Sequence, residues 1–237
     1  MQAIILAGGR GTRLKPYTMN FPKPLVPLGN YPILEIIIRQ LRAQGFCKVT
    51  ISTGHLAELI QAYFGNGDRW DIEIDYVRED KPLNTAGALK LVKDWDENLL
   101  VMNGDVLTTL NYHQLVATHI QHRVQVTVAT TKRESRIDFG IVETDQEGFL
   151  THYREKPVYT YDVSMGVYVL SRSCQDLIEE GEALGMPDLL LRVLKTQQRV
   201  YCHNADCYWL DIGRGDDYEE AQRQFQSNPQ KFLHNGV

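Results

Sequence analysis

The stretch AIILAGGRGTRL, residues 3–14, joins a short apolar run to a turn rich in glycine. Ala3–Ala7 has the length and composition of a buried strand. Three of the four positions from Gly8 to Gly11 are glycine, which permits backbone conformations and close approaches that other residues forbid. Consecutive exposed N–H groups in such a turn can bind an anion. The stretch therefore predicts a strand that leads into a phosphate-binding loop.

The spacing of this turn excludes two common phosphate-binding loops. The pattern GxxxxGK[ST] is absent, and a dinucleotide-binding fingerprint beginning at Gly9 would need a small residue where Leu14 stands. Arg13 and Lys23 follow the glycines, and three nearby prolines restrict the backbone that carries them. We therefore expect a different kind of loop with two fixed cations, although a simple glycine turn followed by solvated charges would give the same pattern.

The first half of the chain alternates short apolar runs with segments of helical period. One helix is expected to carry Ile33, Ile36, Ile37 and Leu41 on a single face, and another spans Leu56–Phe64. This rhythm is typical of βαβ units in a parallel sheet, where the loops at the carboxyl ends of the strands meet at one edge. Besides Ala3–Ala7, the expected strands are Lys48–Ser52, Ile72–Val77 and Leu99–Met102.

The second half is less regular, with helices expected over Asp188–Thr196 and Asp216–Phe225. The fold class is therefore α/β, with a Rossmann-like mixed, mostly parallel sheet flanked by helices. No repeat or flexible linker divides the chain, so we expect a single domain over residues 1–226 and a polar, frayed tail over residues 227–237. The strands expected in this half are Val124–Thr130, Phe139–Glu143, Phe149–Arg154, Val163–Leu170 and Arg199–His203.

Charge and hydropathy exclude two classes of partner. Acidic residues outnumber basic ones 30 to 25, for a net charge of −5, so no general positive field attracts a nucleic acid. The apolar run after Met1 lacks a basic flank and is too short to cross a bilayer. We therefore expect a cytoplasmic protein that binds neither nucleic acid nor membrane.

The wider segment LAGGRGTRLKPYTMNFPKPLVPLGNYPIL, residues 6–34, resembles the N-terminal signature of the sugar nucleotidyltransferases. This family includes mannose-1-phosphate guanylyltransferases, which the pattern resembles most, and glucose-1-phosphate thymidylyltransferases. The resemblance implies the nucleotide-diphospho-sugar transferase fold. It also implies an enzyme that transfers a nucleoside monophosphate from a nucleoside triphosphate to a sugar 1-phosphate and releases pyrophosphate. The further segments that carry the resemblance, in chain order, are Pro82–Ala88, Asn103–Val106, Glu155–Pro157 and Trp209–Gly213.

The resemblance implies that the glycine loop cradles the nucleotide phosphates, while Arg13 and Lys23 bind the phosphoryl group that is transferred. It also implies that Asp105, which follows a strand, and Asp211 hold a metal ion. We expect Mg²⁺, because this hard cation takes one or two carboxylates together with phosphate oxygens. Each aspartate taken singly also suits a turn or a helix cap. The residues of the loop that are implied to bind nucleotide are Leu6, Ala7, Gly8, Gly9, Gly11 and Thr12.

The resemblance implies that Glu79, Thr85 and Gly87 line the nucleobase pocket. A carboxylate only accepts hydrogen bonds, and guanine offers N1–H and N2–H₂ on one edge, a match that thymine and uracil cannot provide. Glu79 therefore favours GTP. An exposed Glu79, with the base read by the backbone alone, would leave dTTP or UTP as the substrate.

Four residues are implied to bind the sugar phosphate. Glu155 and Lys156 lie in an EKP segment that contacts sugar hydroxyls and phosphate in relatives, and Gly140 matches a glycine that leaves room for the hexose. Ser164 stands where relatives often carry Asn, which leaves the identity of the sugar open.

Two rival functions remain at this point. The first is a nucleotide-binding regulatory module that has lost the transfer chemistry, and the second is transfer to a small phosphorylated alcohol that is not a sugar. The presence of the expected cations and of both aspartates favours an active enzyme. Family members of this size often dimerise, so a homodimer is one possible assembly.

Overall fold

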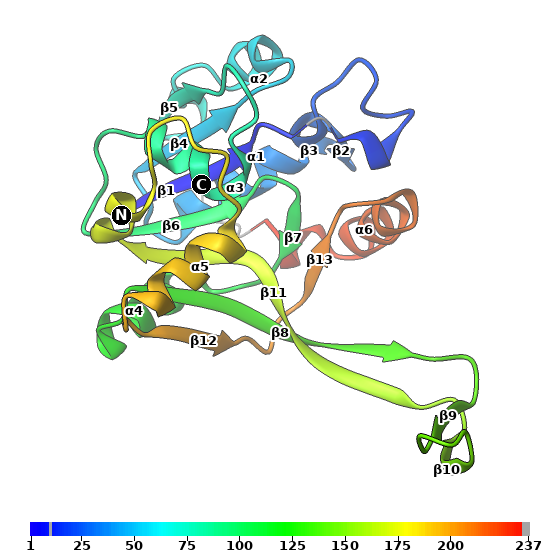
Figure 1. Cartoon of the computed structure of the whole chain (residues 1–237). Coiled ribbons are helices and arrows are strands. Elements are labelled where there is room, and N and C mark those ends of the chain that lie inside the picture. The colour runs from blue at the N-terminus through cyan, green and yellow to red at the C-terminus, as the bar shows by residue number, and fades with distance from the viewer. Residues whose placement is uncertain (10, 234–237) are drawn as a thin grey trace.

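The computed structural model describes residues 1–9 and 11–233 (Figure 1). Its centre is a seven-stranded sheet in the order β12-β8-β11-β6-β1-β4-β5. β11 runs antiparallel to both of its neighbours, and the other neighbouring pairs of this sheet are parallel, which confirms the predicted mixed, mostly parallel sheet. The strands are β1 (Gln2–Ala7), β4 (Lys48–Thr53), β5 (Glu73–Arg78), β6 (Asn98–Asn103), β8 (Val126–Arg136), β11 (Val158–Ser171) and β12 (Val200–Asn204).

Helices cover both faces of the sheet, as expected for this fold class (Figure 1). The apolar stripe predicted around Ile33, Ile36, Ile37 and Leu41 is buried in full. Among the described residues, no helix is both long enough and apolar enough to cross a bilayer. The helices are α1 (Ile33–Ala43), α2 (Ala57–Phe64), the single turn α3 (Asn84–Gly87), α4 (Tyr112–His122), α5 (Met186–Lys195) and α6 (Gly215–Ser227).

The α4 helix was not predicted, because its buried positions are not all aliphatic. Tyr112, Leu115, Val116 and His119 are its buried residues, and they have the i, i+3, i+4, i+7 spacing of a helix face. Counting a tyrosine and a histidine as core residues would have revealed the period. Asn111 caps the helix, since its side chain accepts a hydrogen bond from the Gln114 N–H at 2.8 Å.

A small antiparallel pair outside the main sheet positions the end of the chain. β7 (Val106–Thr108) continues directly from the loop after β6 and pairs with β13 (Trp209–Asp211). In this register Asp211 lies opposite Val106. The pairing therefore places Asp211 beside Asp105, although about a hundred residues separate them in sequence.

β8 and β11 extend far beyond the sheet and form a two-stranded ribbon (Figure 1). The ribbon runs from the pair Thr131 and Val163 to the pair Arg136 and Val158. At its end lies a second small pair, β9 (Ile141–Thr144) with β10 (Leu150–Arg154). We call residues 131–163 the arm and residues 137–157 its tip. The predicted strands ended where the arm leaves the sheet, because TKRESR, residues 131–136, lacks the apolar alternation of a half-buried strand.

Residues beyond the last helix pack on the body. Phe232 is fully buried and lies against the rings of Tyr208 and Phe225. Its carbonyl accepts a hydrogen bond from the Gln40 side chain at 3.0 Å. The domain boundary near residue 226 stays a prediction, and residues 234–237 of the expected tail lie outside the described residues.

Candidate active site

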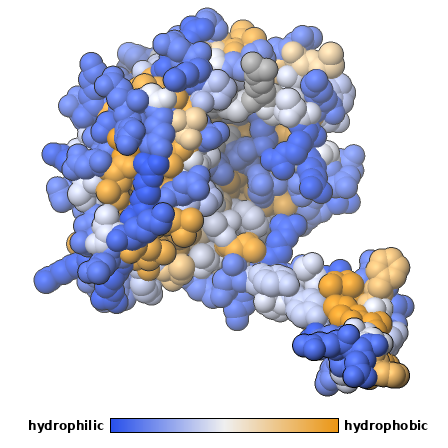
Figure 2. Space-filling model, in the orientation of Figure 1, coloured by the Kyte–Doolittle hydropathy of each residue, from blue (hydrophilic) through white to orange (hydrophobic). Residues whose placement is uncertain are grey.

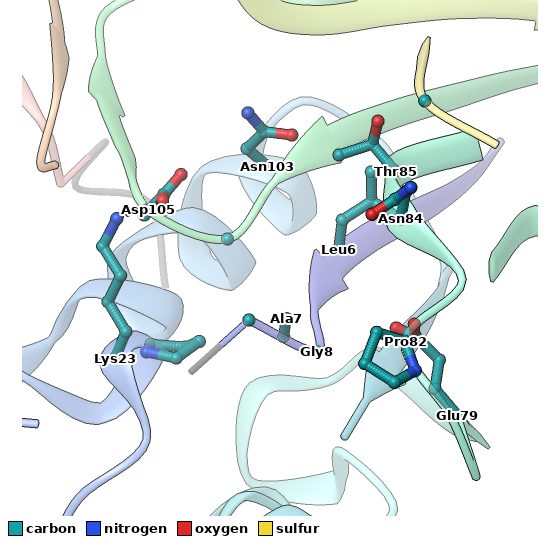
Figure 3. A pocket seen from close by; sticks show the side chains of 14 residues that line it. Leu6, Ala7, Gly8, Lys23, Glu79, Pro82, Asn84, Thr85, Asn103 and Asp105 are labelled. Atoms are coloured by element: carbon teal, nitrogen blue, oxygen red, sulfur yellow. Dashed lines mark hydrogen bonds and ion pairs between the residues drawn. The ribbon is translucent and has the colours of Figure 1, made fainter. Parts of the chain in front are cut away.

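A pocket of about 500 Å³ lies at the carboxyl edge of the sheet (Figure 3). This volume falls within the range of small-molecule sites. β1, β5 and β6 each end at it, so the predicted convergence of loops at one edge agrees with the structure. The pocket is lined by Leu6, Ala7, Gly8, Gly9, Lys23, Pro24, Glu79, Pro82, Asn84, Thr85, Asn103, Gly104, Asp105 and Gly185.

The glycines of the loop after β1 differ in what they do. A Cβ on Gly8 would lie 2.2 Å from Glu79 Oε1, so only glycine lets the loop pass this carboxylate. Gly9 lines open pocket space. Gly11 has a φ of +61°, and its carbonyl accepts a hydrogen bond from the Thr18 hydroxyl at 2.7 Å. Gly11 thus shapes the turn without lining the pocket, and Thr12 is exposed at the start of a 3-10 turn.

The two expected cations lie beside the two expected aspartates. Lys23 is 8% exposed, and its ammonium forms an ion pair with Asp105 Oδ2 (Figure 3). Arg13 lies near Asp211, because a Cβ on Gly213 would be 3.7 Å from Arg13 Nη2 and 3.5 Å from Asp211 Oδ2. The structure therefore brings these four side chains from distant segments into one cluster.

The carboxylates of Asp105 and Asp211 interact with one another. The N–H of Ile212 donates to the Asp105 carbonyl at 3.0 Å, which joins the two segments. Burial raises the pKa of Asp211, and the neighbouring Asp105 carboxylate raises it further, against the opposing effects of Lys23 and Arg13. Asp105 Oδ1 is buried and has no hydrogen-bond partner among the described residues. An orphaned oxygen beside a second carboxylate suits a cation as its missing partner.

In the described part of the site, Asp105 and Asp211 are the side chains that could ligate a metal, and no further ligand groups cluster with them. No group of three or more His, Cys, Asp or Glu residues that could hold a metal occurs in residues 1–9 and 11–233. The donor set therefore fits a cation that completes its shell with ligand oxygens and water, as Mg²⁺ does.

The wall opposite Lys23 is built around Glu79 (Figure 3). The side chain is half-buried, not solvated, and its carboxylate accepts hydrogen bonds from the Ser52 hydroxyl at 3.0 Å and from the Leu83 N–H at 2.9 Å. Thr85 Oγ1 accepts from the N–H of Met186 at 2.7 Å, which ties this wall to the start of α5. Both contacts hold the wall in place and leave Glu79 facing the pocket.

Gly87 lies behind this wall and does not line the pocket. Its N–H donates to the Leu184 carbonyl at 3.0 Å, and a Cβ on it would lie 2.1 Å from the Glu182 carbonyl oxygen. Close packing therefore explains the glycine, and its contact with a nucleotide stays a prediction.

Three of the residues expected to bind the sugar phosphate do not line the pocket, and their role stays a prediction. Gly140, Glu155 and Lys156 lie at the tip of the arm, away from the pocket of their own chain (Figure 1). A Cβ on Gly140 would lie 2.2 Å from Tyr153 Oη, so glycine is needed here for the tyrosine of the same chain. The predicted site is thus divided between the body and the arm, because the ribbon carries the EKP segment outward.

Ser164 lies at the base of the arm, where the pairing of β11 with β8 is irregular between Ser164 and Tyr168. The two hydroxyls are 2.9 Å apart. Within this irregularity Gly166 has a φ of +69° and approaches the side chain of Asn103, which lines the pocket. Ser164 therefore lies two residues from a glycine that approaches the pocket, unlike the residues of the arm tip.

Several lining residues were not among the predicted site residues. Asn103 was detectable, because it ends a strand at the ligand edge. Pro82 and Asn84 belong to the run that the resemblance implied to line the nucleobase pocket, and both line the pocket, although neither was singled out as a site residue. No sequence pattern indicated Gly185, because this residue reaches the pocket only through the packing of α5 against α3.

The fold and the site together define an α/β protein with a pocket at the carboxyl edge of its sheet and a pair of aspartates at the rim of that pocket. The profile of the family described as nucleotidyl transferase matches residues 2–228. This chain belongs to the nucleotidyl transferase family, which confirms the family predicted from the glycine-rich signature.

Two curated relatives and one solved structure extend this finding. The chain is 33% identical to a D-glycero-alpha-D-manno-heptose 1-phosphate guanylyltransferase from Aneurinibacillus thermoaerophilus, with 95% of this chain and 99% of that protein covered. It is 31% identical to a UTP–glucose-1-phosphate uridylyltransferase from Synechocystis sp., with 94% of this chain but 63% of that longer protein covered. A crystal structure of a putative glucose-1-phosphate thymidylyltransferase from Bacillus anthracis superposes with a TM-score of 0.77 at 24% identity, and 94% of each chain is covered. This likeness confirms the predicted fold.

Proposed function

We propose that this protein transfers a nucleoside monophosphate from a nucleoside triphosphate to a sugar 1-phosphate and releases pyrophosphate. The observation that carries the proposal is the cluster of Asp105, Asp211 and Lys23 at the rim of a pocket lined by a glycine loop. Transfers of this kind depend on positioning and on stabilisation of charge. A cytoplasmic location agrees with this function, because nucleoside triphosphates are supplied there.

GTP is the nucleotide that the pocket favours. Glu79 faces the pocket, and each of its carboxylate oxygens accepts one hydrogen bond from the protein, so each keeps lone-pair capacity for a ligand donor. Guanine supplies adjacent N–H donors to such a group, whereas uracil and thymine do not supply a matching pair. The names of the relatives differ in nucleotide, so Glu79 is the feature of this chain that supports GTP.

The residues at the rim fit a divalent cation, for which we propose Mg²⁺. Asp105 and Asp211 would hold it, and Asp105 Oδ1 would gain the partner that it lacks. When bound, Mg²⁺ neutralises the charge of the triphosphate and of the leaving pyrophosphate. Lys23 is kept in position by its ion pair with Asp105, which fixes its charge next to the reacting phosphates.

The chemistry requires orientation more than proton transfer. An oxygen of the sugar phosphate forms a bond to the α-phosphorus, and the bond from that phosphorus to the bridging oxygen breaks, with its electron pair leaving on pyrophosphate. The attacking phosphate is already ionised near neutral pH, so no general base is needed. Backbone N–H groups around Gly8 and Gly9 would orient the nucleotide phosphates, while Lys23 and Arg13 counter the charge that builds up.

The test is turnover by purified protein with Mg²⁺ and a panel of nucleoside triphosphates and sugar 1-phosphates. We expect release of pyrophosphate, with kcat reduced on the order of 100-fold or more by Asp105→Asn and by Asp211→Asn. Asp94→Asn is the matched control, since this exposed carboxylate precedes the amino end of β6, far along the strand from the site. Nucleotide binding without turnover across the whole panel would instead indicate a regulatory binding module.

A further inference from the structure

The arm exposes apolar side chains that no described residue of its own chain covers. Phe139 is 77% exposed, Phe149 67% and Leu150 63%. Figure 2 shows apolar surface gathered at the end of the arm. β9 and β10 pair only with one another in the described structure. A two-stranded ribbon of this kind is marginally stable alone, and a contiguous apolar patch marks an interaction surface. The other large apolar residues exposed on the arm are Val142, Tyr153, Val158 and Tyr161.

The tip also carries a preassembled group of polar residues. The Tyr153 hydroxyl donates to Glu155 Oε2 at 2.8 Å, and the Lys156 ammonium lies 4.0 Å from Glu155 Oε1. Gly140 packs against Tyr153 in the same group. Lys156 and Glu155 are both exposed, so the charged end of this group is available to a ligand or to another surface.

The described residues of the pocket carry little unpaired positive charge. Among them Lys23 is the only cation, it is already paired with Asp105, and Glu79 adds a further negative charge. Arg13 lies at the rim beside Asp211. Two phosphorylated substrates that approach one another need more positive charge than this, and an ammonium at the mouth of the pocket would supply it.

We propose that the arm of one copy of this chain crosses to a second copy and completes the pocket of that copy with Glu155 and Lys156. Each active site is then built from two chains. The proposal rests on the proposed function and extends it. In a closed twofold exchange each copy both gives and receives an arm, so both pockets are completed and both apolar tips are covered.

The dimensions of the arm agree with this exchange. At about 3.3 Å per residue, the six paired residues from Thr131 to Arg136 extend about 20 Å and carry the tip beyond them, outward from the body and toward a neighbouring copy. Its seven exposed large apolar side chains present roughly 700 Å², close to the roughly 800 Å² that each partner buries in a stable interface. The regular pairing from Thr131 and Val163 to Arg136 and Val158 keeps the arm extended beyond the sheet.

The first experiment uses two inactive variants. Lys156→Gln alters only the arm, and Asp105→Asn alters only the pocket. Each variant alone is expected to lose at least about 50-fold in kcat/KM, whereas a purified heterodimer of the two regains about half of the wild-type activity, because one intact pocket receives one intact arm. Glu155→Gln serves as a second arm variant. No recovery in the heterodimer, or an arm variant that keeps full activity, would overturn the proposal.

A reciprocal heterodimer gives the opposite expectation. When wild type is paired with the double variant Lys156→Gln/Asp105→Asn, the intact pocket receives the altered arm, so activity falls to a small fraction of wild type. If each chain used its own arm, this heterodimer would keep about half of the activity. The two heterodimers therefore separate exchange between chains from closure within one chain.

A measurement of assembly separates failure of this proposal from failure of the proposed function. By sedimentation velocity at micromolar concentration, wild type is expected to be a dimer, and Phe149→Ser/Leu150→Ser a monomer. Leu191→Ser/Leu194→Ser is the matched control, because these α5 side chains are 56% and 52% exposed on the body. If wild type turns over no substrate, the proposed function fails, yet a dimer that depends on the tip still supports the arm exchange. A monomeric wild type contradicts it.

Discussion

At the scale of single residues, the site depends on close contacts between charged groups that one motif alone does not contain. Lys23 comes from the segment between β1 and α1, Asp105 from the loop after β6, and Asp211 from near the end of the chain. Their proximity explains why burial and a like charge raise the pKa of Asp211 and why Asp105 Oδ1 stays without a partner. A divalent cation would neutralise the repulsion between the two carboxylates and would give Asp105 Oδ1 a partner. Because phosphate oxygens would complete its ligand shell, we expect the metal and the nucleotide to bind together.

Glu79 provides a prediction at this scale. Glu79→Gln keeps the size of the side chain but replaces one acceptor oxygen by a donor, which cannot accept from guanine. We expect kcat/KM for GTP to fall on the order of 10- to 100-fold, with little change for UTP or dTTP. Steady-state kinetics with the three nucleotides measures the ratio of kcat/KM for GTP to kcat/KM for UTP and dTTP.

The same variant distinguishes a specificity residue from a purely structural one. Glu79 also accepts from Ser52 and from the Leu83 N–H, so loss of those bonds lowers activity with every nucleotide alike. Ser52→Ala is the matched control, since it removes one of these bonds without altering the carboxylate. An equal loss of kcat/KM for GTP, UTP and dTTP in Glu79→Gln would contradict the proposal that Glu79 binds guanine.

At the scale of elements, two strand pairings decide the architecture. β7 with β13 brings the second aspartate to the rim, and β8 with β11 carries the tip away from it. At the end of these two long strands opposite the arm, α4 is fastened to both of them by His119. Its ring nitrogens lie 3.0 Å from Thr127 Oγ1 on β8 and 3.1 Å from Ser171 Oγ at the end of β11. The anchoring of both strands in the body thus depends on a buried imidazole.

His119 gives the stability of the body a predictable response to acid. Burial lowers its pKa to about 4 from an ordinary value of 6.5, so the unfolded chain binds a proton that the folded chain does not. The free energy of unfolding therefore falls as the pH drops through 6.5 toward 4. Between pH 7 and pH 5 this one group is expected to cost about 2 kcal/mol.

Urea unfolding at a series of pH values measures this effect. His119→Gln removes the titrating group and keeps an amide that can bond to Thr127 or Ser171, so its stability is expected to depend less on pH. His152→Gln, at an exposed position of the tip, is the matched control and should keep the wild-type slope. Parallel slopes for wild type and His119→Gln would show that His119 is not the group responsible.

At the scale of the whole molecule, the end of the chain supports the beginning. The Tyr218 hydroxyl and the Gln222 amide of α6 both donate to the Pro27 carbonyl, at 2.8 Å and 2.9 Å, and so hold the segment that follows Lys23. Phe232 lies beneath Tyr208 and Phe225 and closes this side of the core. The C-terminal residues therefore help to fix the cationic side of the pocket.

Phe232→Ala tests this support. Removing a fully buried phenyl ring is expected to lower the free energy of unfolding by about 3–5 kcal/mol, because a cavity remains in the core. Chemical denaturation measures the loss. Leu194→Ala on the exposed face of α5 is the control and should change stability by less than about 0.5 kcal/mol. A loss for Phe232→Ala no larger than for the control would mean that residues beyond α6 do not contribute to the core.

The sequence by itself determined the fold class, the glycine loop, most strands of the sheet and the family, because these follow from local periodicity and from a contiguous motif. It also singled out Glu79 and Asp105, which follow strands whose edge is set by the βαβ rhythm, and Lys23 in the segment between β1 and α1. Only the family resemblance implied that Asp211 joins Asp105, and the tertiary structure is what brings the two together, since a pairing between remote short strands leaves no local period. The tertiary structure also decided that Glu155 and Lys156 leave the pocket of their own chain, because the direction of a polar ribbon beyond its sheet depends on packing and not on residue pattern.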